Sequence, residues 1–137
     1  MFADNGGIVQ LETLEGILTG NANLVSVMTA NNEVGTIQPI KELCDFAHSK
    51  GVMFHTDAVQ AVGHIPIDVK DLGIDFLSAS AHKFNGPKGV GFLYIKRGVE
   101  ILPYLCGGSQ EKGLRAGTEN VAAIVGMATA LQKNINN

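Results

Sequence analysis

Residues 78–91 read SASAHKFNGPKGVG and lie between two short, mainly apolar runs, at 74–77 and 90–95. Small residues come before Lys83 and a Gly-Pro turn signal follows it, so the lysine stands at the end of a predicted buried strand. Most lysines are exposed, and a buried amine needs a partner or a chemical role, such as nucleophilic catalysis. Taken alone, a surface lysine beside a turn is the simpler interpretation of Lys83, and the argument for a chemical role depends on the rest of the chain.

Strand and helix patterns alternate along the sequence. Mainly apolar runs predict strands at 24–28, 52–56, 74–78 and 90–95, and the first two of these are expected to be buried on both faces. Apolar residues at helical spacing predict helices at 11–18, from Pro39 to Gly51, at 68–72, and from Thr118, a good N-cap residue, onward. This alternation predicts an α/β domain in which a mainly parallel sheet is flanked by helices.

The composition narrows the classes of function. The 137 residues are 45% hydrophobic and 17% charged, which fits one globular domain. The net charge of −3 comes without a basic run, which argues against nucleic acid, and no apolar stretch approaches the roughly 18 residues of a membrane span. Cys44 and Cys106 form no C-x-x-C pattern, so we expect a cytoplasmic protein with reduced thiols. His55 and Asp57 are too weak a pattern to predict a metal site.

Polar residues that can take part in catalysis or ligand binding follow the ends of the predicted strands. In chain order they are Asn31, Asn32 and Glu33 after the first strand, Asp57 and Gln60 after the second, and Ser80, His82 and Lys83 after the third. The carboxyl ends of parallel strands share one edge of a sheet, and this is where open α/β sheets bind their ligands. The sequence therefore predicts an amide, a carboxylate and an amine around one site.

Pyridoxal phosphate is a ligand that needs this combination of groups. A lysine amine forms a Schiff base with its aldehyde, and a carboxylate keeps its pyridine nitrogen protonated, so that the ring acts as an electron sink. An amide can hydrogen-bond the ring oxygen, and serine and histidine donors can hold the phosphate. We therefore expect pyridoxal phosphate to be the cofactor.

Four separated motifs resemble those of the cysteine desulfurases, which belong to the class V aminotransferase-like, fold-type I group of pyridoxal-phosphate enzymes. They are ANNEVG at 30–35, HTDAVQ at 55–60, SAHK at 80–83 with GPKG at 86–89, and GGSQE at 107–111 with RAGT at 115–118. The motifs come in the same order as in the family and cover nearly the whole chain. The resemblance implies the fold of the large domain of these enzymes.

The resemblance also implies roles for the residues at the strand ends. Lys83 is similar to the lysine that binds the cofactor covalently, and it would also be the catalytic residue. Asp57 is similar to the partner of the pyridine nitrogen, and Gln60 to the amide that faces the ring oxygen. Ser80 and His82 resemble the phosphate ligands of the family.

Three further positions match the family pattern with more distant roles. Asn32 is similar to an asparagine that lies close to the cofactor and the substrate. Thr118 resembles a threonine that reaches the phosphate bound by the neighbouring subunit, which implies a homodimer. Arg115 lies beside it in the motif, and the resemblance assigns it no definite role.

Several groups of the family pattern have no counterpart in this chain. In the family, the sulfur-accepting cysteine and the arginine that holds the substrate carboxylate lie downstream, and the ring-stacking histidine and a further phosphate-binding threonine lie upstream. We expect Cys44, on the apolar face of a predicted helix, to pack in the core, and Cys106 to be an ordinary thiol. Residues 1–137 are therefore expected to be the central part of the large cofactor-binding domain, without the small C-terminal domain, and to be inactive alone.

For the parent protein, the resemblance implies conversion of L-cysteine to L-alanine and an enzyme-bound persulfide. The sulfur would pass to an acceptor or scaffold protein for iron–sulfur cluster assembly. Two alternatives stay open at this point. A selenocysteine lyase or another class V aminotransferase-like enzyme would share these motifs, and a non-catalytic dimerisation or binding module would keep the fold without turnover.

Overall fold

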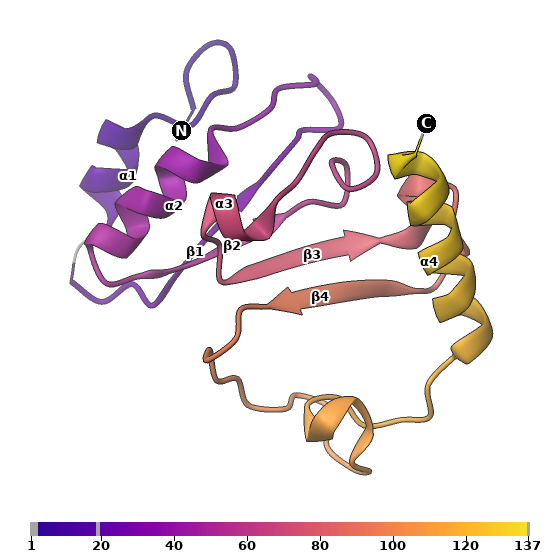
Figure 1. Cartoon of the computed structure of the whole chain (residues 1–137). Coiled ribbons are helices and arrows are strands. Elements are labelled where there is room, and N and C mark those ends of the chain that lie inside the picture. Colours follow the sequence, from indigo (N-terminus) through magenta and orange to yellow (C-terminus); the bar gives the residue numbers. More distant parts are fainter. Residues whose placement is uncertain (1–2, 19, 137) are drawn as a thin grey trace.

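The order of helices and strands follows the predicted alternation (Figure 1). The computed structural model describes residues 3–18 and 20–136. Its elements are α1 (Leu11–Ile17), β1 (Leu24–Met28), α2 (Ile40–Ser49), β2 (Met53–Asp57), α3 (Val69–Leu72), β3 (Phe76–Ser80), the 3₁₀ turn η1 (Ala81–Phe84), β4 (Gly91–Ile95), the 3₁₀ turn η2 (Gln110–Gly113) and α4 (Val121–Ile135). The strand that leads to Lys83 runs two residues further than the sequence predicted, so it ends at Ser80.

The strands form one sheet in the order β1-β2-β3-β4. Strands β1, β2 and β3 are parallel, and β4 runs antiparallel to β3. Parallel neighbours need a crossover of about a dozen residues or more, and the segments that contain α2 and α3 supply the two crossovers. The short connection through η1 instead reverses the chain and makes β4 antiparallel. The prediction of an α/β fold with a mainly parallel sheet is confirmed.

The core lies between α2 and the sheet. Leu43, Cys44 and Ala47 are fully buried on one face of α2, and the fully buried Phe54 belongs to β2, the strand that α2 contacts. The prediction that Cys44 packs in the core is confirmed. Gly51 follows the helix with φ +73°, a left-handed conformation that glycine adopts without steric cost, as the sequence predicted for the end of this helix.

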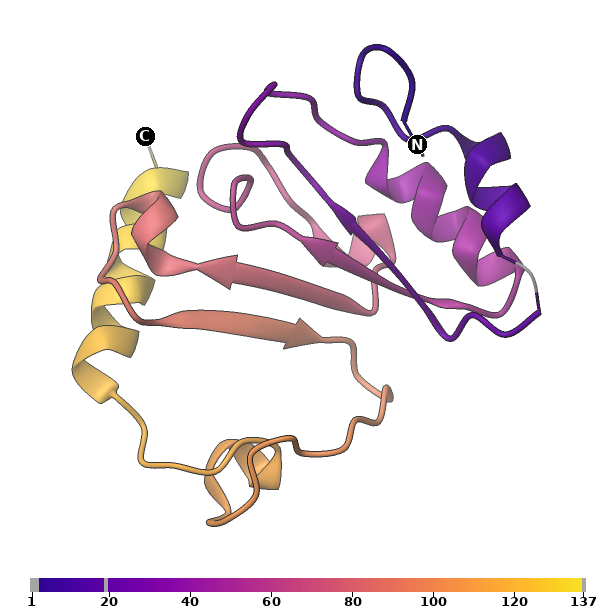
Figure 2. The ribbon, with the colours of Figure 1, turned by 180° about the vertical axis from the view of Figure 1, so that it is seen from behind.

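The opposite side of the sheet faces away from α2 and α3, and Figure 2 shows the strands from this side. We call it the open face and define it by Ser26, His55, Asp57, Ser78 and Ser80, which strand alternation and the β1–β2 and β2–β3 register place together. Exposure alternates along β1 and β2, because the helices cover one side of these strands. The prediction that the strands are buried on both faces is wrong for β1 and β2.

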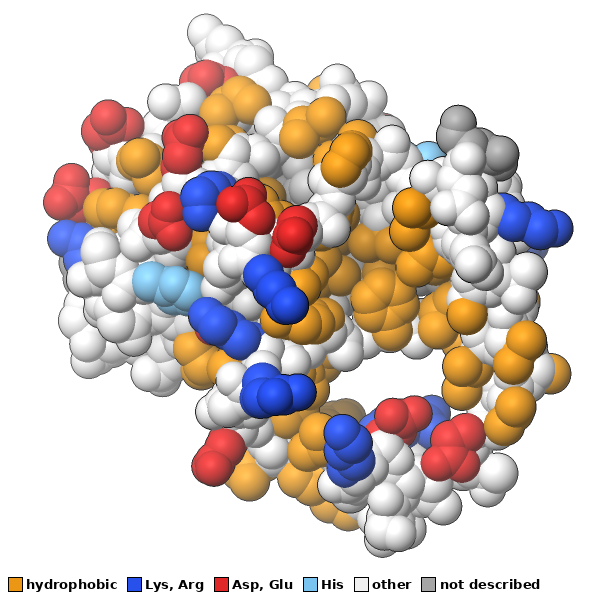
Figure 3. Space-filling model, viewed as in Figure 1, with side chains coloured by type: hydrophobic (Ala, Val, Ile, Leu, Met, Phe, Trp, Pro, Cys, Tyr) orange, Lys and Arg blue, Asp and Glu red, His pale blue; other side chains and the backbone are white. Residues whose placement is uncertain are grey.

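Helix α4 closes the described part of the chain and packs against η1. It begins at Val121, and the side chain of Asn120 caps it by accepting a hydrogen bond from the Ala123 N–H (3.2 Å). The predicted N-cap residue, Thr118, is therefore wrong by two residues, and asparagine is as good an N-cap as threonine. An apolar groove of about 640 Å³ lies on the helix side of the sheet between α3 and α4 (Figure 3). Within the described ranges, no helix has the length and apolar character to cross a membrane.

Candidate active site

Three parallel strands bring the candidate residues to one edge of the sheet. Asp57 is the last residue of β2, Ser80 is the last residue of β3, and Lys83 lies in η1 directly after it. The loop after β1 starts at the same edge, because Met28 pairs with Asp57 in the parallel register. This edge is the place where open α/β sheets bind ligands.

Asp57 is held by backbone contacts from two sides. Its Oδ1 accepts a hydrogen bond from the Val59 N–H (2.9 Å), and its backbone carbonyl accepts one from the Thr29 N–H (2.8 Å). The next residue, Ala58, donates its N–H to the Ser78 carbonyl (2.9 Å), which ties the end of β2 to β3. The partly buried carboxylate is thus fixed in position, and neither a hydrogen bond nor an ion pair to its Oδ2 occurs within the described residues.

Lys83 lies in a turn that the backbone closes. The Gly86 N–H donates to the Ala81 carbonyl (2.8 Å), and the Ala81 N–H donates to the Val90 carbonyl (3.0 Å). Phe84 anchors the turn, since its side chain is fully buried. Lys83 itself is partly buried, and its Nζ forms no hydrogen bond or ion pair with other described residues. The turn therefore presents a free amine from a fixed backbone.

Two contacts that sequence reasoning missed hold this turn from outside. His64 Nε2 lies 2.8 Å from the Lys83 carbonyl, which fastens the loop after β2 to η1. The Asn134 side chain donates from Nδ2 to the Phe84 carbonyl (2.7 Å), which fastens α4 to η1. The loop also comes close at Gly63, where a Cβ would lie 2.8 Å from the Phe84 Cβ. These contacts join segments 19 and 50 residues apart, and no local sequence signal marks them.

The remaining predicted residues fall into two groups. Gln60 lies in the turn after Asp57, and His82 lies exposed in η1, so both stay at the Lys83 edge. Asn32 is exposed on the loop after β1, and its side chain donates to Glu33 Oε1 (2.8 Å) rather than to another candidate residue. Thr118 is exposed on the loop that leads into α4.

Thr118 and Lys83 are separated by most of the length of α4. The hydrogen bond from α4 to the carbonyl of Phe84, next to Lys83, is made by Asn134, near the end of this helix, whereas Gly126, earlier in the helix, lies against Pro87. With a rise of 1.5 Å per residue, Asn134 lies about 20 Å along the axis from Val121, where α4 begins. Arg115 is also exposed on the loop before α4. The fold of this chain therefore does not bring Thr118 or Arg115 together with Lys83.

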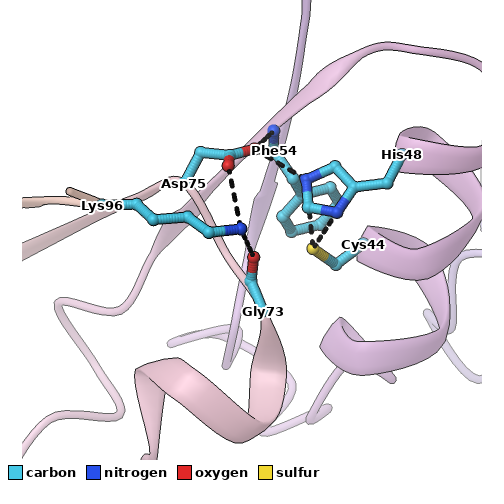
Figure 4. Close-up of polar contacts among 6 residues, drawn as sticks. All are labelled: Cys44, His48, Phe54, Gly73, Asp75 and Lys96. Atoms are coloured by element: carbon cyan, nitrogen blue, oxygen red, sulfur yellow. Dashed lines mark hydrogen bonds and ion pairs between the residues drawn. The ribbon is translucent and has the colours of Figure 1, made fainter. Parts of the chain in front are cut away.

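A second cluster of ionisable groups lies just before the start of β3, at the opposite end of that strand from Lys83 (Figure 4). Asp75 Oδ2 accepts hydrogen bonds from His48 Nε2 (2.7 Å) and from the Phe54 N–H (2.8 Å). Asp75 Oδ1 lies 3.6 Å from Lys96 Nζ. His48 lies one residue before the end of α2, and its ring is partly buried against this carboxylate. We call these residues, with Cys44 beside them, the Asp75 network.

The Asp75 network contains a cysteine, a histidine and an aspartate, but its chemistry is structural. Cys44 Sγ lies 3.9 Å from the His48 ring nitrogens, beyond a strong hydrogen bond. Burial, with a smaller contribution from Asp75, raises the pKa of the Cys44 thiol to about 11. A thiol that is fully buried and protonated is not a nucleophile. Among the described residues there is no group of three or more side chains suited to a metal ion either.

Comparisons with known proteins show the family to which the chain is similar. The family model for aminotransferase class-V matches residues 1–135. Cysteine desulfurase IscS of Clostridium botulinum is 56% identical over 134 residues, which cover 98% of this chain and 34% of that protein. A solved NifS-like protein superimposes with a TM-score of 0.93 at 48% identity, over 98% of this chain and 37% of its own.

A further similar solved structure contains cysteine. It is described as SspA in complex with cysteine, and it matches with a TM-score of 0.92 at 39% identity, over 96% of this chain and 39% of its own. The chain thus spans about a third of the length of the curated relatives it matches. The family model covers nearly the whole chain, and the chain therefore belongs to the aminotransferase class-V family.

Proposed function

We propose that the full-length protein carrying this chain is a pyridoxal-phosphate-dependent cysteine desulfurase, and that residues 1–137 supply the cofactor-binding part of its large domain. The observation that carries the proposal is the placement of Lys83 and Asp57 at adjacent ends of parallel strands. Its support comes from the likeness to cysteine desulfurase IscS at 56% identity. The further details, including the cytoplasmic location, are parts of the same proposal.

The donor groups at the Lys83 edge fit pyridoxal phosphate. An amine without an intramolecular partner can react with the aldehyde, and a backbone-held carboxylate can pair with the protonated pyridine nitrogen. Ser80 and His82 offer a hydroxyl and an imidazole beside Lys83, and none of the described residues forms a hydrogen bond with either side chain. Gln60 adds an amide in the turn after Asp57. We therefore assign these five side chains to the cofactor.

Asp57, Lys83 and Asn32 have different roles in the proposed reaction. The cofactor supplies an electron sink that stabilises negative charge at the substrate α-carbon. Asp57 keeps the ring nitrogen protonated, and the Val59 N–H keeps this carboxylate from rotating away. Lys83 Nζ, once free, removes the proton from the substrate α-carbon and returns a proton to the product, because the closed turn holds it at the site. Asn32 lies on the neighbouring loop, where it can contact substrate and cofactor.

For the substrate we propose L-cysteine, with L-alanine and sulfur on an enzyme thiol as products. Cys44 is buried and protonated, so it does not accept the sulfur. Cys106 lies on an exposed loop, with its thiol 3.7 Å from the Pro103 carbonyl, and we regard it as an ordinary surface thiol. We therefore assign the acceptor thiol to residues outside these 137, so that this chain alone is inactive. A sulfur acceptor or scaffold protein would receive the sulfur for iron–sulfur cluster assembly.

We also propose that the protein is a homodimer. Thr118 lies on the loop before α4, at the far end of this helix from Asn134, so its predicted role at the cofactor phosphate requires a neighbouring subunit. Exposed apolar side chains on the same part of the chain fit a buried interface; they are Leu102, Tyr104, Val121 and Val125. A monomeric full-length protein at micromolar concentration would contradict this part of the proposal.

The direct test measures alanine and sulfide formation from L-cysteine by the full-length protein. We expect Lys83→Ala to abolish turnover, while Lys88→Ala, an exposed lysine five residues further along, retains it. The same assay with L-selenocysteine and with amino-group acceptors separates a selenocysteine lyase or an aminotransferase from a desulfurase. A folded full-length protein that binds no cofactor and turns over none of these substrates would support a non-catalytic module instead.

A further inference from the structure

A row of three hydrogen-bonded side chains crosses the open face at the level of His55, two residues before Asp57 on β2. His55 Nδ1 lies 2.8 Å from Ser26 Oγ on β1, and His55 Nε2 lies 3.2 Å from Ser78 Oγ on β3. Both ring nitrogens are thus engaged, each by a hydroxyl that can rotate to donate or accept. The row joins β1, β2 and β3, the three strands whose ends carry the candidate site.

The row lies where it can influence the position of Asp57. His55 and Asp57 are two residues apart on β2, so their side chains point to the same face, about 7 Å apart along the strand. Ser78 is the register partner of Asp57 on β3 and, two residues later, Ser80 ends that strand. Any displacement of the His55 ring would therefore move the neighbours of both Asp57 and Ser80.

Asp57 is the charged group that His55 faces on the open face. From β1 the neighbouring side chains on this face are Leu24, Ser26 and Met28, and from β3 they are Phe76, Ser78 and Ser80, none of which titrates near neutral pH. Burial lowers the pKa of His55 below its ordinary value of 6.5, although the Asp57 charge acts in the opposite direction. Above pH 6.5 the ring is therefore mainly neutral.

We propose that His55 is a positioning residue for Asp57, which holds the ends of β1, β2 and β3 in register and, as a neutral ring, leaves the Asp57 carboxylate to the cationic pyridine ring of the cofactor. This inference rests on the proposed function. A protonated His55 would place a second positive charge beside Asp57, in competition with the pyridinium. A positive charge on His55, about 7 Å along the strand from the Asp57 carboxylate, is close enough to change an affinity that depends on this carboxylate by several-fold to about tenfold.

The test compares the affinity of the full-length apoprotein for pyridoxal phosphate across pH 5.5–8.5, using the visible absorption of the bound cofactor. The variants are the wild type, His55→Asn, which keeps a neutral group within reach of Ser26, and His55→Ala, which removes both contacts. The cofactor and the other residues of the site are the same in all three proteins. The ratio of the wild-type and His55→Asn affinities therefore isolates the charge on His55.

We expect His55→Asn to match the wild type at pH 8 within about threefold, and to bind up to about tenfold more tightly than the wild type at pH 5.5. His55→Ala should bind more weakly at every pH, and His55→Asn should rescue it. An affinity ratio of wild type to His55→Asn that stays constant across the pH range would overturn the proposal. Absence of cofactor binding by the wild type at pH 8 would instead refute the proposed function, so the two failures are distinguishable.

A second measurement covers the case in which the variants do not fold. In wild-type protein with labelled histidine rings, NMR titration reports the pKa of His55 with and without the cofactor. Because coupling between two sites is reciprocal, binding of the cationic ring should lower the pKa of His55 further. An unchanged or raised pKa of His55 on cofactor binding would contradict the proposal.

Discussion

Charged side chains near the two ends of strand β3 have opposite surroundings: those at one end are paired within the chain, and those at the other are largely unpaired. Before its start, Asp75 is almost fully buried and is matched by His48, Lys96 and the Phe54 N–H. After its end, Lys83 presents an amine with no hydrogen-bond or ion-pair partner among the described residues, and Asp57 on the neighbouring strand binds through one oxygen to a backbone N–H. Buried charges that are matched within the chain stabilise a fold, whereas unmatched ones at a strand edge are available to a ligand.

The difference also separates two ways of building a rigid site. The Asp75 network uses side-chain charges to connect α2, β2 and β4. The Lys83 turn uses backbone hydrogen bonds, the buried Phe84 and glycines that admit close approach. A site built in this way keeps its own charged groups free, because none of them is needed for stability.

The largest expected effect comes from removing the two carboxylates in turn. Asp75→Ala leaves the Phe54 N–H without its acceptor and removes the partner of His48 and Lys96, so we expect a loss of about 3 kcal/mol in the free energy of unfolding. Asp57→Ala removes one backbone hydrogen bond at a partly buried position and should cost about 1 kcal/mol or less. Chemical denaturation of the full-length protein measures both, and equal losses would show that the contrast between the two ends is wrong.

A smaller loss of stability is expected when a side chain is added at Gly91, where β4 comes close to β3 near the Lys83 turn. Gly91 pairs with Ser80, and a Cβ at this position would overlap the Ala79 carbonyl oxygen, a backbone atom that cannot move aside. We expect Gly91→Ala to destabilise the protein by about 2 kcal/mol and to weaken cofactor binding as well.

Gly16→Ala serves as the matched control for Gly91→Ala. Gly16 lies in α1 with nothing within 4 Å of the added Cβ, so its replacement should stabilise the helix by up to about 1 kcal/mol. Thermal or chemical unfolding with cofactor titration reports both quantities. Equal stability of the two variants would contradict the close approach of β4 to β3.

The smallest expected effect is on the pH dependence of the free energy of unfolding. As the pH falls, the contribution of His55, near the Lys83 end, is lost before that of Asp75 at the other end. Burial lowers the pKa of His55 below 6.5, so the unfolded chain binds more protons than the folded one and stability falls as the pH drops below about 6.5. Burial alone would raise the pKa of Asp75, but hydrogen bonds from His48 and the Phe54 N–H outweigh it and lower the pKa below 3.8. The Asp75 contribution is therefore present above pH 3.8 and is lost only at lower pH.

The pH experiment measures unfolding free energy in steps from pH 8 to pH 3. Between pH 7 and pH 5, the wild type should lose more stability than His55→Asn, whereas both should lose the Asp75 contribution alike below pH 4. Parallel curves for the two proteins between pH 7 and pH 5 would show that folding does not lower the pKa of His55.

Much of the fold and of the candidate edge could be predicted from the sequence. Short apolar runs separated by helical patterns gave the parallel strands, and the polar residues after these runs fall at one edge because parallel strands share a direction. The exposed side of β1 and β2 could not be predicted, since an apolar strand sequence does not say which of its faces a helix will cover. The roles of the individual site residues remain predictions.

The supports of the site could not be predicted either, for a different physical reason. His64 and Asn134 contact the backbone of η1 across 19 and 50 residues of sequence, and hydrogen bonds to carbonyl groups leave no trace in a residue pattern. Asp75 lies inside a mainly apolar run, and its burial becomes understandable only once His48 and Lys96 are placed around it. Long-range polar contacts thus set the limit of the sequence argument.

The most direct test of the central claim is to locate the covalent attachment of the cofactor. Full-length protein is incubated with pyridoxal phosphate, its absorption spectrum is recorded, and the adduct is fixed with borohydride and mapped by peptide mass spectrometry. We predict a visible absorption band and a reduced adduct on Lys83. An adduct on another lysine, such as Lys88, or the absence of any adduct in the folded protein, would contradict the assignment of this edge as the cofactor site.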